Sequence, residues 1–178
     1  MLVLNFDPFP ILETERMILR AVSLEDAEDM FFLRTNEDAM KFINKALPKS
    51  IADILELVAK MNDNTMRIQW AMALKTDNKL IGTIGYHIID KDHHRAELGY
   101  MLHPMQWNKG LMSEAIQAVL DFGFNKLGLH SIEARINPAN NASSKILLKH
   151  NFVKEGYFKE SYLFEGTYFD SEIYGLVK

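Results

Sequence analysis

A short polar loop, Gln106 to Gly110, stands where an anion-binding site is expected. It follows the apolar stretch Glu97–Leu102 and a His103-Pro104 turn, and an amphipathic helix begins directly after it. The first backbone N–H groups of a helix have no partner within the helix and readily bind phosphate groups. The spacing therefore predicts a phosphate site beside the end of a strand. Many enzymes hold nucleotide-type cofactors in this way.

The chain contains no cysteine, which excludes several kinds of chemistry together. Disulfides, thiolate metal sites and a cysteine nucleophile are all ruled out. A transferase with this sequence would therefore pass its group directly to the acceptor. The six histidines form neither an H-x-x-x-H nor an H-E-x-x-H pattern, so we expect no metal site.

Length and charge restrict the class of protein further. The 178 residues carry a formal net charge of −4 and fit one domain spanning residues 1–178. An acidic chain is a poor nucleic-acid binder, because phosphate neutralisation needs a basic surface. No apolar run approaches the roughly 20 residues that cross a bilayer, and the N-terminus lacks a signal-peptide pattern. We expect a cytoplasmic protein with neither nucleic acid nor membrane as a partner.

The periodicity of apolar residues predicts the elements that position the loop. Capping-box patterns at Ser23–Asp26 and Ser50–Asp53 predict two helices after the first strand. Three strands joined by short turns predict an antiparallel meander. The helix after Gly110 should end near Gly128, and Asn151 should adopt a left-handed conformation. The predicted strands are 16–22, 68–75, 80–89, 96–102, 130–136, 152–159 and 168–177, and a short helix covers 143–150.

The resulting order is β-αα-βββ-α-β-α-ββ, a mixed α/β (α+β) fold with one parallel crossover in an otherwise antiparallel sheet. This order and several motifs resemble the GNAT family of acyl-CoA-dependent N-acetyltransferases, and within it the Rim-type enzymes that acetylate ribosomal-protein N-termini. The matching segments are Thr14-Glu-Arg-Met-Ile-Leu-Arg20, Glu97-Leu-Gly-Tyr-Met-Leu-His-Pro104, Trp107-Asn-Lys-Gly-Leu-Met-Ser-Glu-Ala115, Asn140-x-x-Ser143, Glu155-Gly156 and Gly166-x-Tyr-x-Asp170.

The resemblance implies acetyl-CoA as cosubstrate. Backbone N–H groups of the loop would hold the pyrophosphate, and the pantetheine arm would add to the exposed edge of the central strand. Trp107 could pack on cofactor or on protein, and Lys109 could contact a phosphate or remain solvated. The residues implied in cofactor binding are Tyr100, Met101, Leu102, Trp107, Asn108, Lys109, Gly110, Leu111, Met112, Asn140 and Ser143.

Amide formation requires a neutral amine, donors for the oxyanion and a stabilised thiolate. Glu97 is the first candidate base, with Glu160, Tyr162 or water alone as alternatives. The oxyanion donor is expected to be a backbone N–H near Met101 and Leu102. Ser143, as the expected N-cap of the last helix, could donate its hydroxyl to the sulfur. Leu147 stands where many GNAT enzymes place a general-acid tyrosine.

The acceptor implied by the resemblance is the α-amine of a protein N-terminus. A polyamine of the spermidine type is the alternative, since acidic residues near the C-terminus could attract a cation; these are Glu155, Glu160, Glu165, Asp170 and Glu172. A non-catalytic acyl-CoA-binding module is a further alternative. Family members form dimers and larger rings, so a homo-oligomer is also an option. The range of acyl chains stays open.

Overall fold

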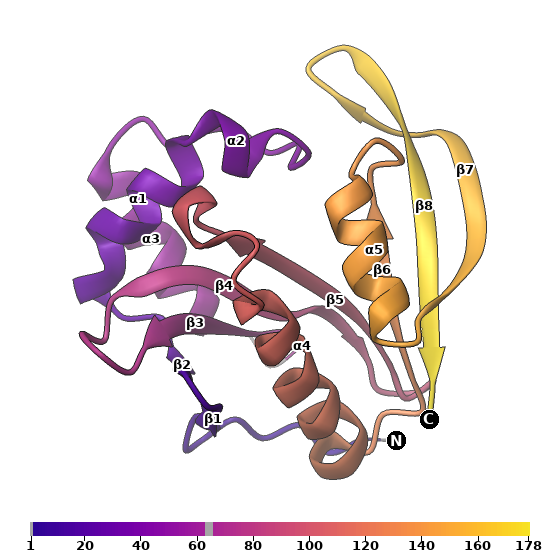
Figure 1. Cartoon of the computed structure of the whole chain (residues 1–178), viewed down its shortest axis with the longest axis horizontal. Helices are drawn as coiled ribbons and strands as arrows, with labels where there is room; N and C mark the ends of the chain where they lie inside the picture. Colours follow the sequence, from indigo (N-terminus) through magenta and orange to yellow (C-terminus); the bar gives the residue numbers. More distant parts are fainter. Residues whose placement is uncertain (1, 63–65) are drawn as a thin grey trace.

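The computed structural model describes residues 2–62 and 66–178, and their framework is an eight-stranded sheet (Figure 1). The strand order is β1-β2-β3-β4-β5-β6-β8-β7, and every neighbouring pair is antiparallel except β5 and β6. The mixed sheet with one parallel crossover is thereby confirmed. The strands are β1 (Leu12–Glu13), β2 (Met17–Ala21), β3 (Ile68–Leu74), β4 (Leu80–Asp90), β5 (Arg95–Leu102), β6 (Ser131–Ile136), β7 (Val153–Phe164) and β8 (Thr167–Val177).

Helices cover both faces of the sheet because the strands alternate apolar side chains between two cores. Trp70 and Met72 of β3 belong to the core under α4, whereas Ala71 between them belongs to the core under α1 and α3. The helices are α1 (Ala27–Thr35), α2 (Glu37–Met40), α3 (Ile51–Asn62), α4 (Leu111–Phe122) and α5 (Asn141–Lys149), with 3₁₀ turns at Leu24–Asp26 and Pro104–Gln106 and a π-helical turn at Gly123–Leu127.

Local signals predicted several element ends correctly. The Asp26 carboxylate accepts the backbone N–H of Ser23 at 2.8 Å, and Asp53 accepts that of Ser50 at 3.1 Å. Gly128 and Asn151 have φ angles of 74° and 64°, as their helix-terminating roles require. The short β1 and α2 were not predicted, since two and four residues are too few to show a period.

The N-cap prediction for Ser143 is wrong. Asn140 caps α5, and its side-chain oxygen accepts the backbone N–H of Ser143 at 3.1 Å. Ser143 is therefore the third residue of the helix. The prediction for β7 was too short, because this strand continues to the Glu165-Gly166 turn, where φ is positive at both residues.

The sheet opens between β5 and β6. These strands pair only at Arg95↔Ser131, Ala96↔Ile132 and Glu97↔Glu133, and the rest of β5 has no partner on that side. Figure 1 shows β5 diverging from the unit formed by β6, α5, β7 and β8. Among the described residues, no helix combines the length and apolar composition needed to cross a membrane.

Candidate active site

A cavity of about 1040 Å³ occupies the opening between β5 and β6. Its lining brings together the middle of β4 and β5, the start of α4, the β6–α5 connection, the segment around α2, and single residues of β7 and β8. Eleven of the twelve residues predicted for the site line it: Glu97, Tyr100, Met101, Leu102, Trp107, Asn108, Gly110, Leu111, Met112, Asn140 and Ser143. Lys109 does not, and its ammonium donates to the Gln106 side chain at 3.1 Å.

The loop before α4 is shaped by two left-handed residues and held by one arginine. Asn108 and Gly110 have φ angles of 59° and 78°, and Gly110 is the residue that begins the helix. Arg16 donates to the Lys109 carbonyl oxygen at 2.8 Å and to the Glu114 carboxylate at 2.8 Å. The two segments that resembled GNAT motifs are thus in contact, and the first fixes the loop of the second. Gly110, Leu111 and Met112 at the start of α4 line the cavity.

Trp107 is hydrogen-bonded to the protein and also lines the cavity. Its indole N–H donates to the Leu102 carbonyl oxygen at 2.8 Å, while 43% of the residue stays exposed. The His103 N–H donates to Ile81 of β4, so alternation along β5 directs the Leu102 N–H and carbonyl away from β4. Met101 has the opposite orientation. Of the two expected oxyanion donors, Leu102 therefore faces the opening.

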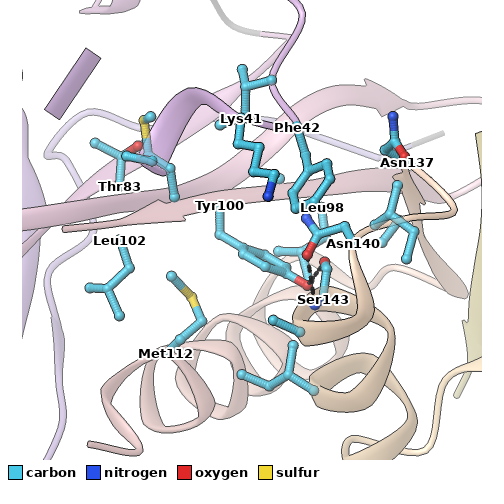
Figure 2. Close-up of a pocket in the computed structure, with 18 of the residues that line it drawn as sticks. Lys41, Phe42, Thr83, Leu98, Tyr100, Leu102, Met112, Asn137, Asn140 and Ser143 are labelled. Carbon is cyan, nitrogen blue, oxygen red and sulfur yellow. Dashed lines mark hydrogen bonds between the residues drawn. The ribbon is translucent and has the colours of Figure 1, made fainter. Parts of the chain in front are cut away.

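Tyr100, Ser143 and Asn140 form one hydrogen-bonded group, visible in Figure 2. The Tyr100 hydroxyl lies 2.7 Å from Ser143 Oγ, and Ser143 is only 6% exposed. Because Asn140 performs the capping, the Ser143 hydroxyl is not used on its own helix. Burial raises the pKa of Tyr100 to about 12, although the bond to Ser143 acts to lower it. The phenol is therefore protonated at neutral pH.

Glu97 lines the part of the cavity on the α1–α2 side of β5. The ion pair that it could have formed with Arg95 is absent, since Arg95 pairs with Glu133. Tyr162 lines the cavity too and binds the side chain of Asn44. Glu160 lies outside the lining, and its N–H donates to Asp170 at 2.7 Å. The five acidic residues near the C-terminus that were expected to attract a polyamine are all absent from the lining.

Sequence reasoning missed the basic residues Arg34 and Lys45 and the histidine His87, all of which line this part of the cavity. His87 sits at a β-bulge in β4, where the register with β5 shifts between Tyr86 and Ile88. A Cβ atom on Gly99 would lie 2.1 Å from the His87 ring, so this glycine makes room for the imidazole. Burial, followed by Lys45 and Arg34, lowers the pKa of His87 to about 4.

No metal site is found in the part of the chain that the structure describes, since no three His, Asp or Glu side chains group as ligands would. The cavity combines main-chain groups, hydroxyl groups and the carboxylate of Glu97. Such a set can bind an acyl thioester and move protons during acyl transfer.

A family model for the acetyltransferase (GNAT) domain matches residues 16–153. The chain belongs to the GNAT family of acetyltransferases. The N-acetyltransferase YoaA of Bacillus subtilis is 36% identical over 173 residues, which cover 96% of this chain and 98% of that protein. The crystal structure of a GNAT-family acetyltransferase from Bacillus anthracis superposes with a TM-score of 0.85 at 29% identity, covering 94% and 98% of the two chains. The predicted GNAT fold and acyltransferase class are confirmed.

The likeness to Rim-type enzymes is confirmed as well. The ribosomal protein uS5–alanine N-acetyltransferase of Escherichia coli is 25% identical over 168 residues, covering 89% of this chain and 86% of the enzyme. The spermidine N(1)-acetyltransferase of Vibrio cholerae is 26% identical over 156 residues, covering 87% and 89%. Relatives thus include enzymes for both acceptor classes. A crystal structure of the spermidine enzyme contains CoA and spermine.

Proposed function

We propose that the chain is a single GNAT domain that transfers acetyl directly from acetyl-CoA to a primary amine, namely the α-amine of a protein N-terminus. The observation that carries the proposal is the opening between β5 and β6, which ends at the start of α4 and has Glu97 and the Tyr100–Ser143 pair along its walls. Main-chain donors for phosphate, an unpaired strand edge and titratable groups therefore share one cavity.

The residues present fit acetyl-CoA. The left-handed backbone at Asn108 and Gly110 leaves the first N–H groups of α4 free to hold a pyrophosphate. The unpaired edge of β5 offers main-chain groups to an amide-bearing arm, which would take the place of a neighbouring strand. Asn140 can contribute less to cofactor binding than expected, because its side-chain oxygen already caps α5. The cosubstrate supplies the thioester carbonyl that the amine attacks.

The proton transfers can be assigned to residues in the cavity. Glu97 removes the proton that the amine loses as its nitrogen bonds to the acetyl carbon. The Leu102 N–H, directed into the opening, donates to the oxyanion. The sulfur takes a proton as the C–S bond breaks, and the Tyr100–Ser143 pair donates to it. Tyr100 thus lies where it can serve in place of the tyrosine that Leu147 replaces.

The test is thiol release from acetyl-CoA with N-terminal Ala and Ser peptides and with spermidine as acceptors. The protein itself has no thiol, so it adds no background to a thiol-reactive dye. Release with peptides is the expected result. Release with spermidine alone would replace the proposed acceptor with the polyamine. CoA binding without turnover of any amine would favour the non-catalytic module.

Variants test the assigned roles. Glu97→Gln should lower kcat/KM by about 100-fold, the lower end of what general base catalysis contributes. Glu160→Gln is its control, because Glu160 lies outside the cavity. Ser143→Ala should lower kcat by about 100-fold, the lower end of what the loss of one donor to a developing charge costs. Ser144→Ala is the matched control, since its hydroxyl binds the Asn141 carbonyl on the same helix. CoA affinity should stay unchanged in Glu97→Gln, Glu160→Gln and Ser144→Ala. Equal loss in Glu160→Gln would overturn the assignment of the base.

A further inference from the structure

Three cations and two carboxylates line the part of the cavity on the α1–α2 side of β5. The cations are Arg34, Lys41 and Lys45, and the carboxylates are Glu97 and Asp38. None of these five groups forms an ion pair within 4 Å with another residue in the described ranges 2–62 and 66–178. The local excess of positive charge is opposite in sign to the net charge of −4 of the chain.

Arg34 is the member of this group that most needs a partner. It extends from the last turn of α1, and its Nε atom is buried without a hydrogen-bond partner among the described residues. The residue as a whole is half-buried, and leaving a partly desolvated guanidinium without a carboxylate partner is costly. Desolvation lowers the pKa of Arg34, and no compensating carboxylate acts on it. An anion bound in the cavity would supply the negatively charged hydrogen-bond acceptor that Arg34 lacks.

Lys45 reinforces this positive charge. Its side chain is exposed toward the cavity from the segment between α2 and α3. Desolvation and repulsion from Arg34 and Arg67 lower the pKa of Lys45, and only Glu97 acts to raise it. Figure 2 shows that the neighbouring Lys41 extends into the cavity as well. Of the two carboxylates, Glu97 is therefore the one that acts on this cluster of cations.

We propose that the acceptor carries an anionic group, a carboxylate or a phosphate, on the same molecule as its amine, and that Arg34 and Lys45 bind this group while Glu97 receives the amine. The inference rests on the proposed function and narrows its acceptor class. A peptide with an acidic residue close to its N-terminus meets both requirements. A polycationic amine could bind Glu97, but it carries no anionic group and is repelled by Arg34 and Lys45.

The test compares peptides that differ only in the residues after an N-terminal Ala or Ser, which are acidic, neutral or basic. A second set carries phosphoserine, to separate phosphate from carboxylate. Acidic peptides should show kcat/KM at least about tenfold above neutral ones, which corresponds to about 1.4 kcal/mol. The preference should weaken with added salt, as expected for partly solvated charges.

Variants locate the anion site. Arg34→Met should remove most of the acidic preference, and Lys45→Glu should reverse it in favour of basic peptides. Lys79→Met is the control, because Lys79 is exposed in the turn before β4, outside the cavity. The reversal in Lys45→Glu cannot arise from misfolding, since it requires a gain of activity toward one class. Equal use of all peptides by the unaltered protein would overturn the inference and leave the proposed function intact.

A binding measurement keeps the inference independent of turnover. Calorimetry with CoA present should show tighter binding of acidic than of neutral peptides, and Arg34→Met should abolish the difference. An NMR titration gives a second readout, because an anion beside Arg34 and Lys45 should raise the pKa of His87 from about 4 toward its ordinary value of 6.5. If no peptide is acetylated but acidic ones bind preferentially, the proposed function fails and the anion site stands. Equal binding of all peptides overturns the site.

Discussion

Replacing Arg16 with alanine should weaken the binding of CoA without altering the catalytic groups. Arg16 holds the loop before α4 through the Lys109 carbonyl and the Glu114 carboxylate, each at 2.8 Å. Both contacts are charge-assisted, and such bonds contribute about 1.5–3 kcal/mol when well buried. The Arg16 side chain is 44% exposed, so each contact is discounted toward the 0.2–1 kcal/mol range of surface pairs. The sum is about 1–2 kcal/mol.

This free energy should be lost mainly from cofactor binding. The Lys109 carbonyl lies between the left-handed residues Asn108 and Gly110. This carbonyl must be fixed if the N–H groups of α4 are to point at one anion. A loss of about 1–2 kcal/mol raises the Kd for CoA by roughly 5- to 30-fold. Titration calorimetry with CoA measures the change directly, and kcat at saturating acetyl-CoA should remain near that of the unaltered protein.

Two further variants make the experiment decisive. Lys75→Ala is the control, because Lys75 pairs with Glu13 at 3.4 Å near the same end of the sheet without contacting the loop. The Kd of Arg16→Lys for CoA should lie between those of the unaltered protein and Arg16→Ala. Lysine retains the charge but cannot bind two acceptors with a planar, forked group. Unchanged CoA affinity in Arg16→Ala would show that the contact of Arg16 with the loop before α4 does not support CoA binding. An equal loss in Lys75→Ala would attribute the effect to the sheet.

Three other predictions concern stability. Arg20→Ala should lower the free energy of unfolding in urea by about 3 kcal/mol, because it leaves the Asp26 carboxylate, 5% exposed and held at 2.8 Å by two guanidinium nitrogens, without its cation. Burial alone would raise the pKa of Asp26, but hydrogen bonds from Arg20 and Ser23 bring it below its ordinary value of 3.8. Its contribution is therefore complete above that value and lost as pH falls below it, so Asp26→Asn should remove most of the pH dependence of the free energy of unfolding measured between about pH 4 and pH 2. Asn140→Ala should cost about 1 kcal/mol as the lost cap of α5, whereas Asn141→Ala, within the first turn, should be nearly neutral in the same thermal melts.

Most of the fold was predictable because the signals for its helices, strands and turns lie within a few neighbouring residues of the sequence. The two capping boxes, the six buried apolar positions of α4 and the turn residues each act within one element, and the structure agrees with them. The cap of α5 was mispredicted because Asn140 and Ser143 are both good capping residues at a spacing of three. Only the direction of the bond, from the Ser143 N–H to Asn140, distinguishes the two assignments.

The basic part of the site could not be predicted in the same way. Arg34 lies in α1, Lys45 in the segment between α2 and α3, and Glu97 in β5, so no local pattern joins them. His87 reaches the cavity through a bulge that no local pattern reveals, since the residues around it read as a regular strand. Arg34 in the last turn of a helix looks like an ordinary partner of the helix dipole. Its lack of a carboxylate partner appears only when the chain is folded.

The opening between β5 and β6 also bears on how the protein behaves when cofactor is scarce. Only three residue pairs join these strands, so much of β5 presents unbonded main-chain groups within an otherwise continuous sheet. Such an edge is a template on which a strand from another molecule can form. A CoA arm lying along it would block that growth as well as serve as substrate. Cofactor supply should then govern the tendency of this protein to aggregate, and not only the rate of its reaction.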